Sequence, residues 1–223
     1  IYDCWILKLN ASGTIEWQTS LGGDQNENCY AVHQTADGGY IVGADSESDI
    51  SGNKTESSFG GKDYWIIKLN ASGTKIWEKA YGGNGTDLFA DINLTADGGS
   101  IIGGSSNSNF SGNKNENTNG MNDFWVLKLS SSGTIDWQNT IGGSHNDDVY
   151  FCQQTLDGNY FVGGSSASEI SGDKTEAQFG AAVGLGDYYV MQLNTSGDII
   201  WQNTIGATRD DQCYAGIQLS DGT

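Results

Sequence analysis

One stretch of about 60 residues is repeated almost four times along this 223-residue chain. The segment DYWIIKLNASGTKIW begins at Asp63, and related segments begin at Asp3, Asp123 and Asp187, at spacings of 60, 60 and 64 residues. A fixed period of this size is typical of proteins built from stacked structural units. The sequence therefore divides into repeats at approximately 1–62, 63–122, 123–186 and 187–223, the last of which is incomplete.

Each repeat carries the pattern of two β-hairpins. In the second repeat, IIKLN and KIWEKAY flank the turn ASGT, and LFADINLT and SIIGGSS flank the turn ADGG. β-Branched and aromatic runs joined by short glycine-containing turns predict hairpins. No window places apolar residues at helical spacing, so we expect an all-β chain. Four antiparallel strands in each unit of about 60 residues predict the blades of a β-propeller.

The charge balance excludes two classes of partner. The chain has 28 acidic and 10 basic residues, a net charge of −18. Nucleic acids and anionic membranes attract clustered Lys and Arg, so neither is an expected partner. No apolar run approaches 18 residues, and we expect no direct membrane insertion.

The tryptophans and cysteines occupy repeat positions. Trp recurs on one predicted strand at 5, 65 and 125 and on the next at 17, 77, 137 and 201, which predicts packing between sheets rather than sugar stacking. Cys4, Cys29, Cys152 and Cys213 fall on strand positions and are expected to act as small buried hydrophobes. A disulfide remains an alternative, but the spacing selects no pairing.

The repeat resembles known propeller units. The run L-N-x-S-G-T-x-x-W resembles the strand–turn–strand–Trp unit of quinoprotein-type propellers. The full unit, DYW-x-x-KL-x-x-SG-x-x-x-W followed by GG and T-x-DGGY-x-x-GG, is similar to the delta-60-type repeats of large secreted and surface-anchored bacterial proteins, many of which use the type IX, sorting-domain secretion route. The resemblance covers essentially the whole chain and implies a secreted or cell-surface piece of a longer parent protein. The fourth copy departs from it at Tyr189, Gln192 and Ala207.

The resemblance also implies the order of strands within a blade. The innermost strand, A, would follow the acidic positions Glu27, Asp87, Asp147 and Asp211, and strands B, C and D would lie at 40–44, 4–9 and 15–20 and their equivalents. The chain would then hold strands C and D of one blade, three whole blades and strand A of another. We expect a segment of a larger ring, because a four-bladed ring closed from these strands would lack one strand and leave an open edge.

The B–C connections are long and share the sequence SG-[ND]-K-x-E. Their alternating oxygen-bearing side chains and sharp Gly turn suit Ca²⁺, although no cofactor is required. The candidate metal ligands are Asp49, Ser51, Asn53, Glu56, Glu116, Asp173 and Glu176. The interpretation that we prefer is that these side chains cap loop backbone, while Lys54, Lys114 and Lys174 neutralise the carboxylates.

The same loops are the predicted binding surface. The turns ASGT and ADGG are short and share one face, so every long connection lies on the opposite face. Polar loops with isolated aromatic residues suit a glycan or a cell-surface protein as partner. The candidate ligand-binding residues are Asp49, Asn53, Phe59, Asn109, Asn113, Asp173 and Phe179.

The remaining polar residues give little sign of catalysis. His33 and His145 lie at unrelated repeat positions. The lysines at 8, 68 and 128 and the acid pair Asp147–Asp148 are expected to be solvated. We therefore expect a non-catalytic adhesion or binding module. The alternatives are a quinoprotein-like enzyme, which the single Arg209 disfavours, and a purely structural spacer.

Overall fold

The computed structural model describes residues 1–179 and 185–219. Across these residues the chain is all-β and has no helix, and hence none long and apolar enough to cross a membrane. The strands are β1 (Cys4–Leu9), β2 (Ile15–Leu21), β3 (Glu27–Gln34), β4 (Tyr40–Ser46), β5 (Asp63–Leu69), β6 (Lys75–Tyr81), β7 (Asp87–Leu94), β8 (Ser100–Ser106), β9 (Asp123–Leu129), β10 (Ile135–Ile141), β11 (Asp147–Gln154), β12 (Tyr160–Ser166), β13 (Asp187–Leu193) and β14 (Ile199–Ile205).

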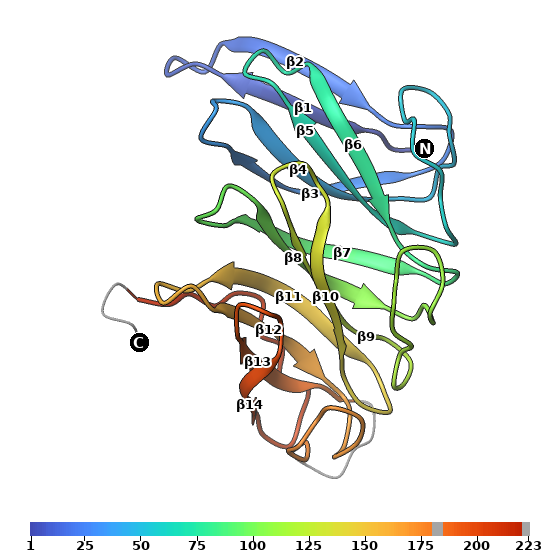
Figure 1. Ribbon diagram of the computed structural model, residues 1–223, viewed down its shortest axis with the longest axis vertical. Helices are drawn as coiled ribbons and strands as arrows, with labels where there is room; N and C mark the ends of the chain where they lie inside the picture. Colours follow the sequence, from blue (N-terminus) through green and yellow to red (C-terminus); the bar gives the residue numbers. More distant parts are fainter. Residues whose placement is uncertain (180–184, 220–223) are drawn as a thin grey trace.

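The strands form one two-stranded and three four-stranded antiparallel sheets (Figure 1). β1 pairs with β2, and the larger sheets have the orders β3-β4-β5-β6, β7-β8-β9-β10 and β11-β12-β13-β14. Every pairing joins strands that are consecutive in the chain, as the hairpin patterns predicted. The prediction of an all-β chain with four antiparallel strands in each complete unit is confirmed.

Local side-chain hydrogen bonds explain the short turns. In the ASGT turn of the second repeat, Asn70 Oδ1 accepts the backbone N–H groups of Ser72 and Thr74, both at 3.0 Å. Gly73 has φ of +79°, a conformation that favours glycine because a side chain would be strained there. A glycine with positive φ lies at the equivalent position of every repeat, so each turn reverses the chain within a few residues and sets the register of the flanking strands.

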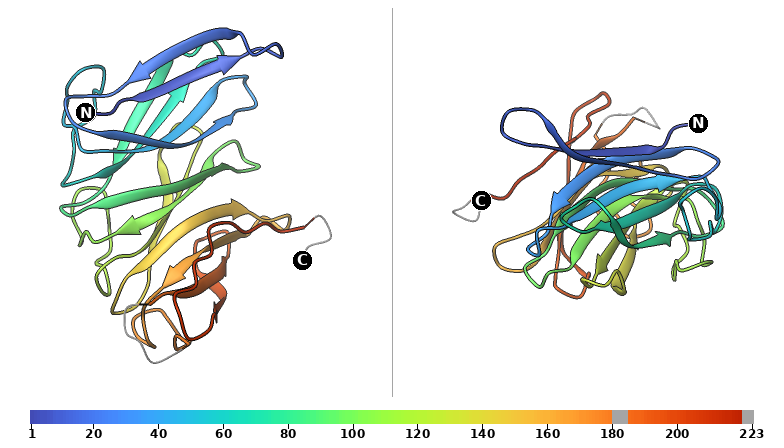
Figure 2. Two further views of the ribbon diagram at one scale, coloured as in Figure 1. Left: turned by 180° about the vertical axis from the view of Figure 1, so that it is seen from behind. Right: turned by 90° about the horizontal axis from the view of Figure 1, so that it is seen from above.

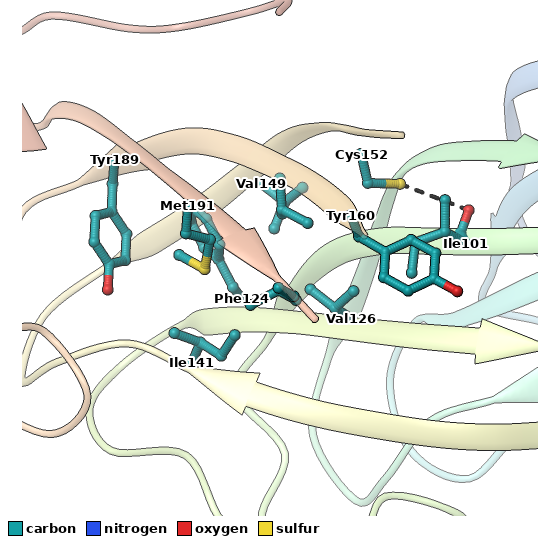
Figure 3. Packing of buried hydrophobic residues seen from close by; sticks show 11 residues of the cluster. Ile101, Phe124, Val126, Ile141, Val149, Cys152, Tyr160, Tyr189 and Met191 are labelled. Carbon is teal, nitrogen blue, oxygen red and sulfur yellow. Dashed lines mark hydrogen bonds between the residues drawn. The ribbon is translucent and has the colours of Figure 1, made fainter. Parts of the chain in front are cut away.

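The sheets follow one another along the long axis of the molecule (Figures 1 and 2). A hydrophobic core lies between each pair of neighbouring sheets. The last strand of one sheet leads directly into the first strand of the next, and β7 lies beside both β3 and β11. Figure 3 shows the core between the last two sheets, where Phe124 and Tyr189 are fully buried. There the Cys152 thiol donates to the Ile101 carbonyl at 3.6 Å.

The two ends of this stack differ from its middle. Trp65 and Trp125 are fully buried, whereas the equivalent Trp5 on β1 is 63% exposed, because no sheet lies beyond β1–β2 in the described residues. At the other end, the predicted strand A after Asp211 is wrong, since no strand is present in residues 206–219. This segment lies against β11, where the rings of Tyr150 and Tyr214 are 4.9 Å apart, but it pairs with no strand in residues 1–179 and 185–219.

Candidate functional site on the long-loop face

Three long connections leave the sheets at one edge of the molecule. They span 47–62, 107–122 and 167–186, and residues 180–184 of the third lie outside the described residues. Figure 1 shows the first two on the right, on the side of the N-terminus, with short turns such as β3–β4 and β7–β8 at the opposite edge. This edge, formed by the long connections and the β2–β3, β6–β7 and β10–β11 connections beside them, is named here the long-loop face.

Asn53 binds the preceding β2–β3 connection through its backbone and side chain. The Asn53 N–H donates to the Gly22 carbonyl at 3.0 Å, and Gly22 N–H donates back to Asn53 Oδ1 at 2.9 Å. Asn53 Nδ2 also donates to the Ser20 carbonyl at 2.9 Å. Asn113 makes the corresponding three bonds to Gly82 and the Ala80 carbonyl, at 2.8 to 3.1 Å. The side chains proposed as ligands therefore hold loop backbone in place.

The third repeat has Asp173 at this position, which lacks the amide donor and accepts a hydrogen bond from a neighbouring loop. Asn119 Nδ2 donates to Asp173 Oδ2 at 2.8 Å. Partial burial raises the pKa of Asp173 above its usual range. Adjacent long loops thus touch, as they also do where the Phe59 ring lies 2.8 Å from the position that a β-carbon on Gly112 would take.

Serine and acidic side chains at the start of the loops bind further backbone groups. Ser51 Oγ accepts the Asp24 N–H at 3.0 Å and donates to the Asp49 carbonyl at 3.1 Å. Asp49 itself is exposed and accepts the Ser58 N–H at 3.4 Å. In the second loop, the Asn109 carbonyl accepts from the Ser111 hydroxyl at 2.8 Å. These contacts agree with the preferred interpretation, in which the polar side chains cap backbone.

The final residues of the shared sequence reach the last strand of their own sheet. Glu116 and Glu176 accept the N–H groups of Thr140 and Thr204, each at 2.6 Å. In the first loop, the Glu56 carbonyl accepts from Lys54 Nζ at 2.5 Å. The side chains of Asn53, Glu116 and Glu176 are therefore each bonded to backbone. In residues 1–179 and 185–219, no group of three or more His, Cys, Asp or Glu side chains has the arrangement of a metal centre.

The loop lysines act on the nearby carboxylates through their charge, as the sequence predicted, but form no direct ion pair with them in the described part of the chain. Lys114 Nζ donates to the Glu116 carbonyl at 2.9 Å and to Thr140 Oγ1 at 2.7 Å, and lies 5.8 Å from the centre of the Trp125 ring. Burial lowers the pKa of Lys114 to about 8. Lys54 and Lys174 are equally buried and bind loop carbonyls in the same way. These side chains anchor the loops from beneath.

Buried carboxyl groups lie under the loops, which corrects the prediction that Asp147 is solvated. Asp147 is fully buried and accepts the Gly143 N–H at 2.7 Å. Asp123, at the start of β9, accepts the Asn119 N–H, and its Oδ1 has no partner in the described residues. Both carboxyls lie where a β-carbon on Gly142 would be, so they face each other across this glycine. Burial, and then the charge of Asp147, raise the pKa of Asp123 to about 7.

The most exposed apolar side chains of the loops share one repeat position. Ile50, Phe110 and Ile170 precede the SG turn in the three loops and are 62%, 70% and 64% exposed. Phe59 and Phe179 are also exposed, while their N–H groups donate to the buried carboxylates that begin β5 and β13. Of the first set, only Phe110 was expected among the isolated aromatic residues of the binding face, and Ile50 and Ile170 were not predicted. The signal was present as one large apolar residue before every SG, between polar neighbours.

Ile50, Phe110 and Ile170 are called the loop tips below. An acidic hollow lies beside the first of them, Ile50. It has a volume of about 620 Å³ and is lined in part by Asp24, Glu47 and Asp49, with Lys62 at one side. Lys62 forms ion pairs with Asp45 at 3.2 Å and Glu47 at 3.8 Å. The long-loop face thus combines exposed apolar tips with carboxylates on a backbone held by many hydrogen bonds.

Comparison with known proteins does not assign the chain to a family. No protein-family model matches the sequence, and no curated protein is similar to it at a significant level. The long-loop face is therefore interpreted from its own residues and geometry.

Proposed function

We propose that this chain is a segment of a β-propeller that serves as a non-catalytic binding module of a secreted or cell-surface protein, and that its long-loop face binds another protein. The observation that carries the proposal is the exposure of Ile50, Phe110 and Ile170 at equivalent loop tips. Apolar side chains that recur on one exposed face favour an interaction surface, because their exposure to water is unfavourable. Hydrogen bonds to neighbouring backbone hold the tips in position before a partner arrives.

The repeated packing between sheets supports the propeller. Trp65 packs on the sheet before its own, and Trp125 does the same one repeat later. Trp5 would be buried in this way by a further sheet placed against β1–β2. Sheets that repeat one contact around a common axis are the architecture of a propeller.

The chemistry of the face favours a protein over a glycan. Glycans bind most readily to flat aromatic faces, and two of the three equivalent tips are Ile. The hollow lined by Asp24, Glu47 and Asp49 and the net charge of −18 attract basic groups. We therefore expect a partner that presents apolar side chains flanked by Lys or Arg. Contacts at successive loops would add in affinity, because the three tips are held on one frame.

The proposal is tested by comparing binding with the tips present and removed. The 223-residue chain is screened against an array of extracellular proteins and against a glycan array. The variant I50S/F110S/I170S is expected to weaken protein binding at least about tenfold while leaving the melting temperature almost unchanged, since the tips are exposed. Binding that is unaffected by this variant, or that is confined to the glycan array, would overturn the proposal.

The matched control changes the opposite edge of the molecule. Ser12, Ser72 and Ser132 occupy equivalent exposed positions in the short turns, and replacing all three with Ala alters polarity there without touching the long loops. Protein binding is expected to survive this change. Its loss would place the binding surface on the short-turn edge instead.

A further inference from the structure

The short-turn edge contains a contact that is made in two of the three gaps between sheets. Trp17 of β2 packs edge-on against Tyr40 of β4, with ring centroids 5.3 Å apart and planes at 68°. Trp137 and Tyr160 repeat this contact in the third gap, at 5.4 Å and 67°. In both gaps a phenol ring from one sheet fills the space over the tryptophan of the sheet before it.

The middle gap lacks this ring. The residue that faces Trp77 there is Ser100, which is the repeat equivalent of Tyr40 and Tyr160. A cavity of about 340 Å³ lies at this place, lined by Trp77, Ser100 and the apolar side chains of Ile41 and Leu94, among others. The loss of a phenol ring at one repeat position thus coincides with a cavity at the same position.

The packing of Trp77 is also looser than that of its counterpart. The nearest atom of the Trp77 ring lies 3.0 Å from the position that a β-carbon on Gly133 would take, against 2.5 Å for Trp17 and Gly73. The surrounding structure has therefore not closed over the missing ring.

A cation lies at the polar end of this cavity. Lys68 is buried, and its Nζ donates to Thr35 Oγ1 and to Asp37 Oδ1, the latter at 2.9 Å. The expectation of a solvated lysine is wrong here, and the partner belongs to the ADGG turn. An ammonium group has three N–H donors, so one is left for a ligand oxygen among the described contacts of Lys68. In the first gap, the equivalent Lys8 is paired with Glu16 at 2.8 Å and lies near the Tyr40 side chain.

We propose that the cavity between Trp77 and Ser100 binds a small phenolic ring, with the ring edge-on to Trp77 and its hydroxyl directed to Lys68. The ligand would restore the contact that Tyr40 makes with Trp17. This site lies on the short-turn edge and does not depend on the long-loop face.

The size and lining of the cavity fit this class of ligand. Small-molecule sites begin at about 300 Å³, and an apolar cavity of about 150 Å³ already binds a benzene ring. Aromatic pairs prefer the edge-on geometry seen in the two filled gaps. An aliphatic ring would lose this interaction with Trp77, and a ring without a hydroxyl would leave the Lys68 donor unused.

The test uses p-cresol, which is the tyrosine side chain without its backbone, with the full 223-residue chain. Calorimetric titration is expected to show one saturable site with a dissociation constant of about 1 mM or lower. Cyclohexanol and toluene are the matched probes, and both are expected to bind at least about threefold more weakly. N-acetyl-tyrosinamide is titrated as well, because it carries the same phenol ring on a peptide backbone. Its affinity relative to that of p-cresol distinguishes a peptide tyrosine from a free phenol as the source of the ring.

Substitutions at Ser100 locate the site. S100Y is expected to remove p-cresol binding and to raise the melting temperature by about 2–5 °C, because the new ring fills the cavity. S100A leaves the cavity open and is expected to keep binding. K68M is expected to remove the preference for p-cresol over toluene while keeping toluene binding.

Y160S supplies an independent check by opening the third gap. It is expected to change the stoichiometry from one p-cresol to two, with S100Y/Y160S returning it to one. Absence of binding to the unaltered chain at about 10 mM, binding that persists in S100Y, or equal binding of cyclohexanol would each overturn the proposal.

Discussion

The thiols of Cys4 on β1 and Cys29 on β3 lie close together, where the two-stranded sheet meets the sheet after it. The neighbouring Cys29 thiol, and then burial, raise the pKa of Cys4 well above its usual range, and the neighbouring Cys4 lowers the pKa of Cys29. The Cys29 thiolate is therefore the more accessible nucleophile of the pair.

We predict that mild oxidation forms a single disulfide between Cys4 and Cys29. With diamide as the oxidant, two thiols lose two hydrogens and one S–S bond forms, so the mass falls by about two daltons. Titration of the denatured chain should then count two free thiols instead of the four that the sequence contains. C152S should still form the bond and C4S should not. A Cys29–Cys213 or intermolecular product would contradict the prediction.

The buried Asp123 carboxyl predicts a particular dependence of stability on pH. Its pKa is about 7 in the folded chain and near 3.8 ordinarily, so the folded state holds its proton more tightly. This contribution is fully present below about pH 4 and is lost as pH rises to about 7. D123N removes the titration and should be more stable than the unaltered chain by about 4 kcal/mol at pH 8, with little difference at pH 4.

Chemical unfolding at several pH values measures this difference. E169Q removes an exposed carboxylate in the same repeat and controls for the change in net charge. The difference in the free energy of unfolding between D123N and the unaltered chain should increase from pH 4 to pH 7 and then level off. A gap that is constant with pH, or that is equal for E169Q, would contradict the assignment.

Asn113 and Asp173 occupy the same repeat position, so exchanging each for the other residue type tests what the amide contributes to stability. Asn113 Nδ2 donates to the Ala80 carbonyl at 3.0 Å, a bond that a carboxylate cannot donate. We predict that N113D lowers the free energy of unfolding by about 1–2 kcal/mol at pH 7 and that D173N raises it by about 0.5–1 kcal/mol. Thermal melts of both variants test this, with destabilisation by D173N as the contrary result.

The loop geometry also predicts the response to calcium. Asn53, Glu116 and Glu176 each have a backbone partner within 3.0 Å, so binding a cation would cost these bonds. We expect equal melting temperatures in the presence of Ca²⁺ and of a chelator. A rise with Ca²⁺ that is lost in E116Q/E176Q would instead support the calcium site.

The sequence predicted the parts of the fold that are encoded locally. The period of 60 residues and the turns at Asn70–Thr74 and its equivalents place the strands to within a few residues, because Asn, Ser and Gly make their turn contacts over short distances. The prediction of a strand after Asp211 was wrong, because a strand needs a neighbouring strand to pair with and a local sequence pattern does not show whether one is present.

The contacts between repeats could not be predicted in the same way. The bond of Asn53 to Gly22 and the contact of Cys4 with Cys29 depend on how one sheet lies against the next. The alignment of repeats shows that Ser100 stands where other repeats have Tyr. That this leaves a cavity could not be predicted, because it depends on the position of Trp77 across the gap. Repeat periodicity therefore predicts strands better than it predicts sites.

The bonds between Asn53 and Gly22 have a mechanical consequence. These hydrogen bonds link residues that are 31 positions apart, and Asn113 and Gly82 form the same link, called a tie below, one repeat later. Tension applied along the chain would reach β3 and β4 only after the first tie breaks, and the second tie would then carry the load. We expect such a chain to lengthen in steps of about 200 Å, one repeat at a time, rather than in a single event. On a surface exposed to flow, a module of this kind would absorb force while most of its loops kept their shape.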